Sequence, residues 1–159
     1  MAGRSARVVT ASTRAAAGVY PDRGGELVVD TLRSWGADVP DAAVVPDGAA
    51  VSVAIGAALA QGVDLLITTG GTGLTPTDGT PEATRPFLTC EVPGLAEAIR
   101  FRGVASGIPT AALSRGLVGL AGRTLVVNLP GSSGGVRDGL AVLAEVIEHA
   151  LSQLAGGDH

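Results

Sequence analysis

The sequence LLITTGGTGLTPTDGTPE, residues 65–82, contains a strand, a glycine-rich loop, an acid and a helix start in succession. Residues 65–69 are apolar or β-branched, which predicts a strand buried on both faces of a parallel sheet. Gly70, Gly71 and Gly73 allow a sharp turn and let a ligand approach the backbone N–H groups closely. A side chain at Gly71 is therefore expected to impair ligand binding more than stability, because the loop lies at the edge of the sheet.

The second half of this segment adds an acid and a helix N-terminus. Asp78 follows the glycines, and Thr80-Pro81-Glu82 is typical of a helix start, with Thr80 as the N-cap and proline in the first turn. A helix N-terminus favours anions, so this order can hold an anion and place a carboxylate beside it. A simpler interpretation is a plain turn in which Asp78 only caps the helix.

Predicted strands and helices alternate along the rest of the chain. This alternation indicates an α/β fold with a mainly parallel sheet covered on both faces, plus one antiparallel excursion. No internal repeat or linker interrupts residues 1–159, so we expect one domain. The expected strands are 6–11, 42–45, 63–69, an extended segment at 110–114, and a hairpin of 117–120 and 124–129. The expected helices are 23–35, 49–61, one from 81 that Pro86 kinks or ends, 93–102 stopping at Gly103, and 136–154.

Composition narrows the classes of function. The hydrophobic fraction is 46% and the charged fraction 16%, as in a globular protein with a sizeable core. The net charge of −4 disfavours a general nucleic-acid binder. No run reaches membrane-spanning length and no signal-peptide core is visible, so we expect a soluble, cytoplasmic protein that contacts neither membrane nor nucleic acid.

The residue types that are missing restrict the chemistry further. All 11 basic residues are arginine, which excludes a P-loop lysine or a Schiff-base lysine. The two histidines, His149 and His159, lie near the C-terminus, and Cys90 is the single cysteine. A Ser-His-Asp triad or a zinc site is therefore not expected. The groups that remain for catalysis or binding are carboxylates, hydroxyls, arginines, backbone N–H groups and a bound Mg²⁺.

Four loops follow the carboxyl ends of predicted parallel strands, where open α/β sheets bind ligands. Two of them carry an acid, Asp47 in Pro-Asp-Gly and Asp78 after the glycines. Mg²⁺ commonly takes one or two protein carboxylates together with substrate phosphates, so we predict a metal site at these acids. Each acid has a structural alternative, since Asp47 also suits an ordinary turn, and Ser132 or Ser133 suits a helix N-cap.

The chain resembles the MogA/MoaB family of molybdenum-cofactor biosynthesis proteins. Residues 68–84 follow the family signature TTGGTGxxxxDxTPEAT, and residues 12–22, STRAAAGVYPD, are similar to its S-x-R-x-x-x-G-x-Y-x-D. Further similar segments in the same order are VPD at 45–47, VPGL at 92–95, ALSR at 112–115 and NLPGS at 128–132.

The resemblance implies a three-layer α/β/α molybdopterin-binding fold, usually a homotrimer. It also implies an adenylyltransferase that uses Mg²⁺ and ATP to adenylylate the terminal phosphate of molybdopterin and releases pyrophosphate. A MoeA-type protein would then insert molybdate. On the family pattern Asp47 and Asp78 match the two functional acids that serve catalysis and the metal. The substrate-binding candidates are Ser12, Arg14, Gly70, Gly71, Thr72, Gly73, Ser114, Arg115, Pro130, Gly131 and Ser132.

The reaction suits a chain that lacks a well-placed histidine. A phosphate oxygen is already ionised at neutral pH, so no general base is needed, and the main tasks are alignment and charge neutralisation. The alternative is a MoaB-type molybdopterin carrier or assembly protein without catalysis. A dinucleotide-binding protein is a third interpretation, but the run from Gly70 to Gly73 lacks the G-x-G-x-x-G spacing.

Overall fold

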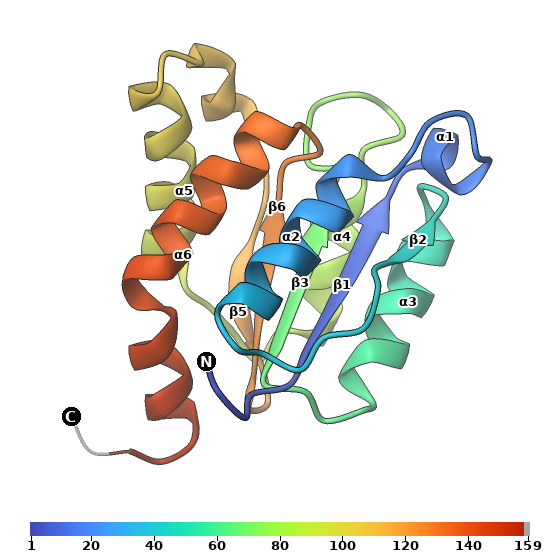
Figure 1. Ribbon diagram of the computed structural model, residues 1–159. Coiled ribbons are helices and arrows are strands. Elements are labelled where there is room, and N and C mark those ends of the chain that lie inside the picture. Colours follow the sequence, from blue (N-terminus) through green and yellow to red (C-terminus); the bar gives the residue numbers. More distant parts are fainter. Residues whose placement is uncertain (158–159) are drawn as a thin grey trace.

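A computed structural model describes residues 1–157; Asp158 and His159 lie outside the described residues. The chain forms a six-stranded sheet in the order β2-β1-β3-β6-β5-β4, with helices on both faces (Figure 1). The first four strands in this order are parallel, and β5 runs antiparallel to its neighbours β6 and β4. The strands are β1 (Ala6–Ala11), β2 (Ala43–Val45), β3 (Leu65–Thr69), β4 (Cys90–Glu91), β5 (Val118–Ala121) and β6 (Thr124–Leu129).

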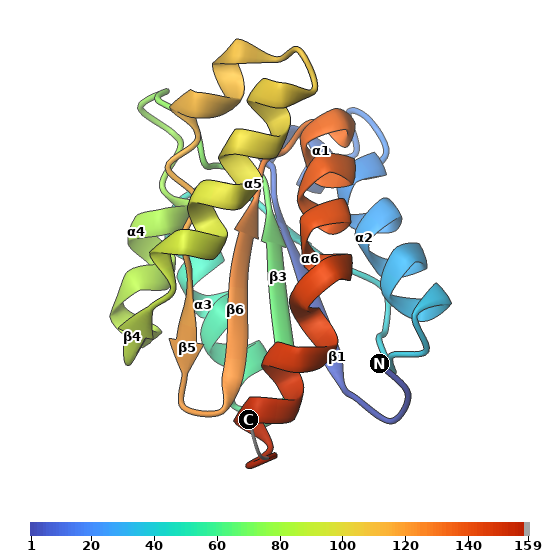
Figure 2. The ribbon, with the colours of Figure 1, turned by 90° about the vertical axis from the view of Figure 1, so that its left-hand side faces the viewer.

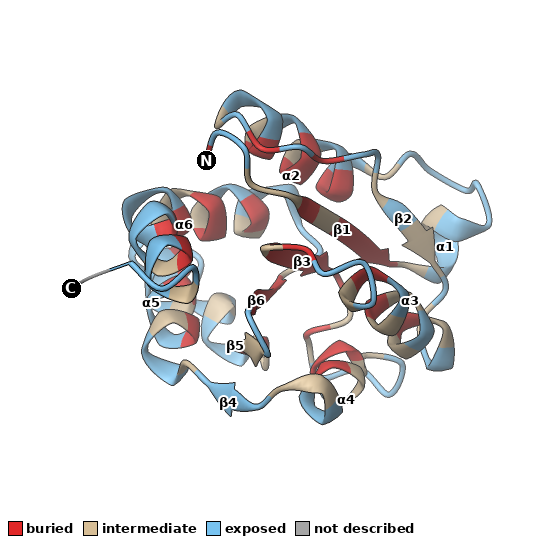
Figure 3. Ribbon diagram, turned by 90° about the horizontal axis from the view of Figure 1, so that it is seen from below, coloured by how far each residue is buried: buried red, intermediate tan, exposed pale blue. Residues whose placement is uncertain are grey.

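The helices form two layers that enclose separate parts of the core. The larger cluster packs α2, α5 and α6 against strand residues such as Val8, Ile67 and Val127. The smaller cluster packs α3 and the α4 region against residues such as Val9, Leu66 and Val126. Figure 3 shows buried residues on the sheet between these layers, and Figure 2 shows α5 beside α6. The helices are α1 (Thr13–Ala16), α2 (Arg23–Ser34), α3 (Ala49–Leu59), α4 (Thr80–Thr84), α5 (Pro93–Ala105) and α6 (Ser133–Leu154).

Neighbouring strand residues belong to opposite clusters, since side chains alternate along a strand. Apolar residues on both faces of β3 and β6 therefore confirm the predicted three-layer α/β/α fold. The hairpin of β5 and β6 is also confirmed. No helix within residues 1–157 is both long and apolar enough to cross a bilayer.

Several local predictions were wrong in informative ways. Residues 13–16, expected as loop, form α1 because the Ser12 hydroxyl accepts a hydrogen bond from the Ala15 N–H. The segment expected to be extended at 110–114 is a 3-10 helix, η2 (Pro109–Leu113). Helix α5 continues through Gly103, whose missing side chain makes room for Ala111. Pro86 does end α4, which passes into the 3-10 helix η1 (Arg85–Phe87).

The start of α4 also differs from the prediction. Thr80 is the first residue of the helix, Gly79 occupies the N-cap, and no side chain caps it. The hydroxyl of Thr80 is buried and has no hydrogen-bond partner among the residues described. Asp78 does not cap this helix either, since its carboxylate bonds to Thr75.

The glycine loop turns directly after β3. Gly70 and Gly71 have φ of +91° and +62°, a region that L side chains rarely adopt. A Cβ at Gly71 would lie 2.4 Å from the buried Thr80 Oγ1, inside the fold rather than toward solvent. A side chain at Gly71 is therefore expected to reduce stability as well, in addition to the predicted loss of ligand binding.

A buried amide network connects this loop region to the sheet. Asn128 on β6 donates to Thr68 Oγ1 on β3 (2.9 Å) and to Thr84 Oγ1 on α4 (3.0 Å). Its carbonyl oxygen accepts from the Leu117 N–H at 3.1 Å. Because buried polar groups are costly unless bonded, this satisfied network fixes α4 against two strands.

Candidate functional site

The carboxyl ends of the parallel strands open into a cavity of about 880 Å³. Its walls come from the loops after β1, β2, β3 and β6 together with the first residues of α2 and α6. This is the edge of the sheet that the sequence predicted, and the volume suits a small-molecule site. Seven predicted site residues line it: Ser12, Arg14, Asp47, Gly70, Gly71, Asp78 and Gly131.

Asp47 is held by Thr13 from the neighbouring loop. The Thr13 N–H and hydroxyl both donate to Asp47 Oδ2, at 3.0 Å and 2.7 Å. The Asp47 N–H donates back to Thr13 Oγ1 at 3.1 Å. These bonds occupy one carboxylate oxygen, and Oδ1 has no hydrogen bond among the described residues.

Asp78 repeats this arrangement on the glycine loop. The Thr75 N–H and hydroxyl donate to Asp78 Oδ2, at 2.9 Å and 2.7 Å. Asp78 Oδ1 has no hydrogen bond within residues 1–157. Two acids after separate strands thus each retain one carboxylate oxygen for a ligand.

A third acid at the cavity, Asp22, differs from these two. Its Oδ2 accepts from the Thr10 hydroxyl at 2.6 Å, and its Oδ1 accepts from the Gly25 N–H at 2.9 Å as the N-cap of α2. Both oxygens of Asp22 therefore serve the fold. Among these three acids, Asp47 and Asp78 are the two that keep one carboxylate oxygen without a hydrogen bond in the described residues.

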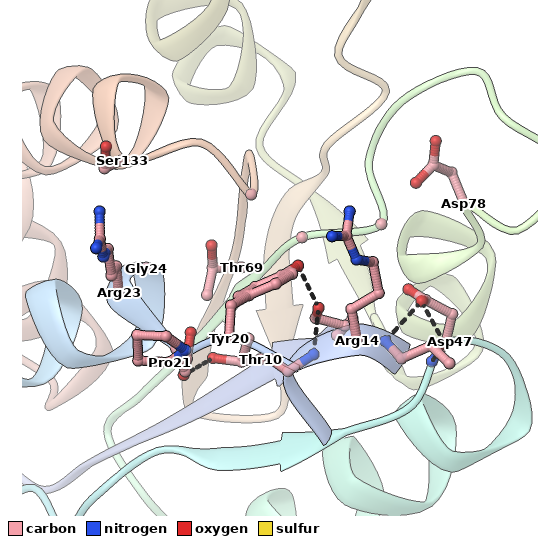
Figure 4. Close-up of a pocket in the computed structure, with 18 of the residues that line it drawn as sticks. Thr10, Arg14, Tyr20, Pro21, Arg23, Gly24, Asp47, Thr69, Asp78 and Ser133 are labelled. Carbon is pink, nitrogen blue, oxygen red and sulfur yellow. Dashed lines mark hydrogen bonds between the residues drawn. The ribbon is translucent and has the colours of Figure 1, made fainter. Parts of the chain in front are cut away.

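Two arginines line the cavity without an acidic partner in the described part of the chain. The Arg14 guanidinium lies over the Tyr20 ring, 5.1 Å from its centroid, and the Tyr20 hydroxyl is 2.9 Å from Ser12 Oγ. Arg23 begins α2. Figure 4 shows Arg23 and Ser133 toward one end of the cavity and Arg14, Asp47 and Asp78 toward the other. The cavity thus has an arginine toward each end, and Asp47 and Asp78 lie toward the end that holds Arg14.

The donor set at the acidic end fits Mg²⁺. Residues 1–157 contain no cluster of three or more His, Cys, Asp or Glu that could hold a metal alone. Mg²⁺ does not need one, because it usually takes one or two carboxylates and fills its other positions with water and substrate phosphate. The unoccupied oxygens of Asp47 and Asp78 are carboxylate ligands of this kind.

Six predicted substrate-binding residues do not line this cavity: Thr72, Gly73, Ser114, Arg115, Pro130 and Ser132. Several of them have hydrogen-bond partners within the fold. Ser132 Oγ accepts from the Gly135 N–H as the N-cap of α6, as one structural alternative predicted. The Pro130 carbonyl accepts from the Thr69 hydroxyl at 2.7 Å. The Ser114 hydroxyl donates to Thr72 Oγ1 at 3.3 Å.

Sequence reasoning missed other lining residues, among them Thr10, Thr13, Tyr20, Asp22, Arg23, Gly24, Thr69, Thr77 and Ser133. Tyr20 and Asp22 stand in the S-x-R-x-x-x-G-x-Y-x-D segment, so that signal was available. Thr13 gave no signal, because its partner Asp47 lies 34 residues away.

Comparison with known proteins was consistent with this architecture. Residues 7–149 match the family model described as a probable molybdopterin binding domain. A molybdenum cofactor biosynthesis bifunctional protein from Synechococcus elongatus is 42% identical over 160 residues, which cover all of this chain and 50% of that protein. The chain therefore spans about half the length of the first curated relatives that it matches.

Solved structures extend the similarity to the fold. The Mog protein of molybdopterin biosynthesis from Mycobacterium ulcerans has a TM-score of 0.91 and 52% identity, over 96% of this chain and 99% of that one. The molybdopterin biosynthesis enzyme MoaB from Thermus thermophilus has a TM-score of 0.87 and 41% identity, over 96% and 97%. The chain belongs to the MogA/MoaB family of molybdenum-cofactor biosynthesis proteins.

Proposed function

We propose that this protein is a Mg²⁺-dependent molybdopterin adenylyltransferase, which transfers AMP from ATP to the terminal phosphate of molybdopterin. The observation that carries the proposal is the pair Asp47 and Asp78. Each keeps one carboxylate oxygen without a hydrogen bond in the described structure while a threonine holds the other. Two such acids suit a cation placed between them and the substrate phosphates, because uncompensated carboxylates would repel a phosphate.

The proposed reaction exchanges one phosphoanhydride bond for another. A terminal phosphate oxygen of molybdopterin attacks the α-phosphorus of ATP, the bond from that phosphorus to the bridging oxygen breaks, and pyrophosphate leaves with the electron pair. Mg²⁺, held by Asp47 and Asp78, would neutralise charge on the α-phosphate and the leaving pyrophosphate. No proton has to be removed from the nucleophile, so the absence of a histidine among the described residues that line the cavity is no obstacle.

The remaining groups of the cavity suit two anionic substrates. Arg14 and Arg23 can each pair with phosphate, since neither has an acidic partner within residues 1–157. The backbone at Gly70 and Gly131 approaches closely enough that a Cβ at Gly131 would lie 3.2 Å from Gly70 Cα. A surface without side chains at this point lets a substrate lie directly against the backbone. These features align substrates, which is the main demand of a phosphoryl-type transfer.

Assembly and partners form a second part of the proposal. We propose a homotrimer, supported by three large exposed apolar side chains on or beside α5 and η2: Phe101, Ile108 and Leu113, at 73%, 53% and 53% exposure. A MoeA-type partner would take the adenylylated product. The curated relatives named bifunctional, which are twice as long as the match, support such a neighbouring activity. We also propose a cytoplasmic location, because the reaction consumes ATP.

The experiment that tests the function is incubation of the protein with molybdopterin, ATP and Mg²⁺. Pyrophosphate and adenylylated molybdopterin are followed together, and molybdopterin binding is measured separately by titration. The proposal expects both products in equal amounts. Binding without either product would instead identify a MoaB-type carrier.

A further inference from the structure

The side chain of Arg115 hydrogen bonds to the loop that carries Asp78, although Arg115 and Asp78 are 37 residues apart in the sequence. Its side chain is half-buried and lies outside the cavity. Its backbone N–H donates to the Thr72 carbonyl at 2.8 Å, so this segment runs alongside the start of the glycine loop.

The guanidinium connects both ends of the loop 73–78. Arg115 Nε donates to the Gly73 carbonyl at 2.8 Å, and Nη2 donates to the Asp78 carbonyl at 2.9 Å. The remaining Nη1 pairs with Glu82 on α4. A planar fork of donors can close a loop in this way, whereas a lysine ammonium on a flexible stem cannot satisfy the same set of acceptors with fixed geometry.

The loop has little else to hold it. Residues 74–77 are all exposed, so no apolar core forms beneath them. Within the loop, the Asp78 N–H donates to the Thr75 carbonyl at 3.0 Å, and Thr75 holds Asp78 Oδ2. In the described part of the chain, Arg115 is the one residue outside the loop whose side chain hydrogen bonds to residues 73–78. The position of the Asp78 carboxylate therefore depends on the hydrogen bonds from Arg115.

The backbone on either side of Arg115 is held by hydrogen bonds from Arg100. Arg100 on α5 donates through Nη1 to the carbonyls of Ser114 (3.4 Å) and Gly116 (3.0 Å), the residues on either side of Arg115. The chain of contacts thus runs from a helix on one face of the sheet to the acid at the cavity.

We propose that Arg115 is a positioning residue that sets the Asp78 carboxylate for its cation, rather than a substrate-binding residue. The inference rests on the proposed function in one respect, that Asp78 binds a divalent cation. It assigns no contact between Arg115 and either substrate. It also predicts that Arg115 acts through Asp78 alone.

The test compares Arg115→Lys and Arg115→Gln with Glu82→Gln, which removes only the exposed ion pair and serves as the matched control. Hydrogen exchange of the backbone amides in 73–78 reports the loop without any ligand. Electron paramagnetic resonance of Mn²⁺ in the presence of ATP measures the affinity of the proposed cation site at Asp78. Both Arg115 variants should lose loop protection, while the amides of β3 keep theirs. Mn²⁺ binding should weaken by about tenfold or more, as when a group behind a metal ligand is removed.

A double substitution separates positioning from general stability. In the Asp78→Asn background, Arg115→Lys should not weaken Mn²⁺ binding further, because residues acting through one another are not additive. Loop protection and Mn²⁺ affinity equal to wild type in both Arg115 variants would overturn the inference. So would an additional loss of the same size in the Asp78→Asn background. A wild-type protein that binds Mn²⁺ as expected but forms no adenylylated product would refute the proposed function while leaving the role of Arg115 intact.

Discussion

Thr13 and Asp47 hydrogen bond to each other in both directions. Thr13 donates its N–H and hydroxyl to Asp47 Oδ2, and the Asp47 N–H donates to Thr13 Oγ1. The pair joins the loop after β1 to the loop after β2 at the acidic end of the cavity. The orientation of one proposed metal ligand is therefore set by a residue on a different strand-end loop.

Replacing Thr13 with valine should reduce turnover more than stability. The variant keeps the N–H bond to Asp47 but loses both bonds that involve the hydroxyl, so the carboxylate can rotate. The free energy of unfolding should fall by roughly 0.5–1.5 kcal/mol in total, because both lost bonds are exposed to water and each contributes little. Misplacing the acid should slow turnover about tenfold to hundredfold. Urea unfolding and initial rates measure the two effects, and Thr13→Ser, which keeps the hydroxyl, should behave as wild type. Normal turnover in the valine variant would remove the positioning role.

Asp47→Asn and Asp78→Asn should each keep the fold and molybdopterin binding but lose most turnover. The amide has the shape of the carboxylate and can still accept from the threonine, while the charge that would bind Mg²⁺ is gone. Asp22→Asn is the matched control, since it removes a charge from the same cavity at an acid whose oxygens both serve the fold. It should keep most activity. Equal losses in all three variants would indicate a general electrostatic effect of the cavity instead.

Gly71→Ala should destabilise the protein. The residue has a φ of +62°, and its Cβ would lie 2.4 Å from Thr80 Oγ1, so the free energy of unfolding should drop by about 1–3 kcal/mol. Gly79→Ala is the control in the same loop, because Gly79 has a negative φ and no atom within 4 Å of its Cβ. Adding Thr80→Ala, which removes a hydroxyl without a hydrogen-bond partner in the described structure, should restore part of the loss. Thermal unfolding of the wild type and these three variants checks this, and a Gly71→Ala protein as stable as wild type would contradict the loop geometry.

The sheet and the positions of the two acids could be predicted from local sequence patterns, whereas the conformations of the loops depend on contacts between distant residues. Alternating strands and helices leave a strong local pattern, and an acid after a strand must lie at the carboxyl edge of the sheet. Arg115 shows where such reasoning stops. Its segment resembles a substrate-binding motif, yet its acceptors are backbone carbonyls at Gly73 and Asp78, which carry no side-chain signal. Thr80 shows the same limit, because one residue of shift at a helix start turns an N-cap into a buried hydroxyl.

Glu82 should make stability depend on pH in the acid range. The pKa of Glu82 lies below its ordinary value of 4.5, because the carboxylate accepts from its own backbone N–H and from Arg115. The unfolded chain then binds the proton more tightly, so the contribution is fully present above the unfolded pKa and is lost as pH falls through the lower folded pKa. At neutral pH Glu82→Gln should cost roughly 0.2–1 kcal/mol, as for an exposed ion pair. Below the folded pKa the two proteins should unfold at the same urea concentration, and a difference that persists there would rule out this origin.

The most direct test of the central claim is single-turnover adenylyl transfer by the wild type and the double variant Asp47→Asn/Asp78→Asn. Each protein is loaded with molybdopterin and mixed with Mg²⁺ and ATP, and pyrophosphate and adenylylated molybdopterin are quantified by mass spectrometry. If the two carboxylates hold the cation, the wild type should give equal amounts of both products. The double variant should give neither product, although it should still bind molybdopterin. Product formation at the wild-type rate by the double variant, or no product from the wild type, would contradict the claim.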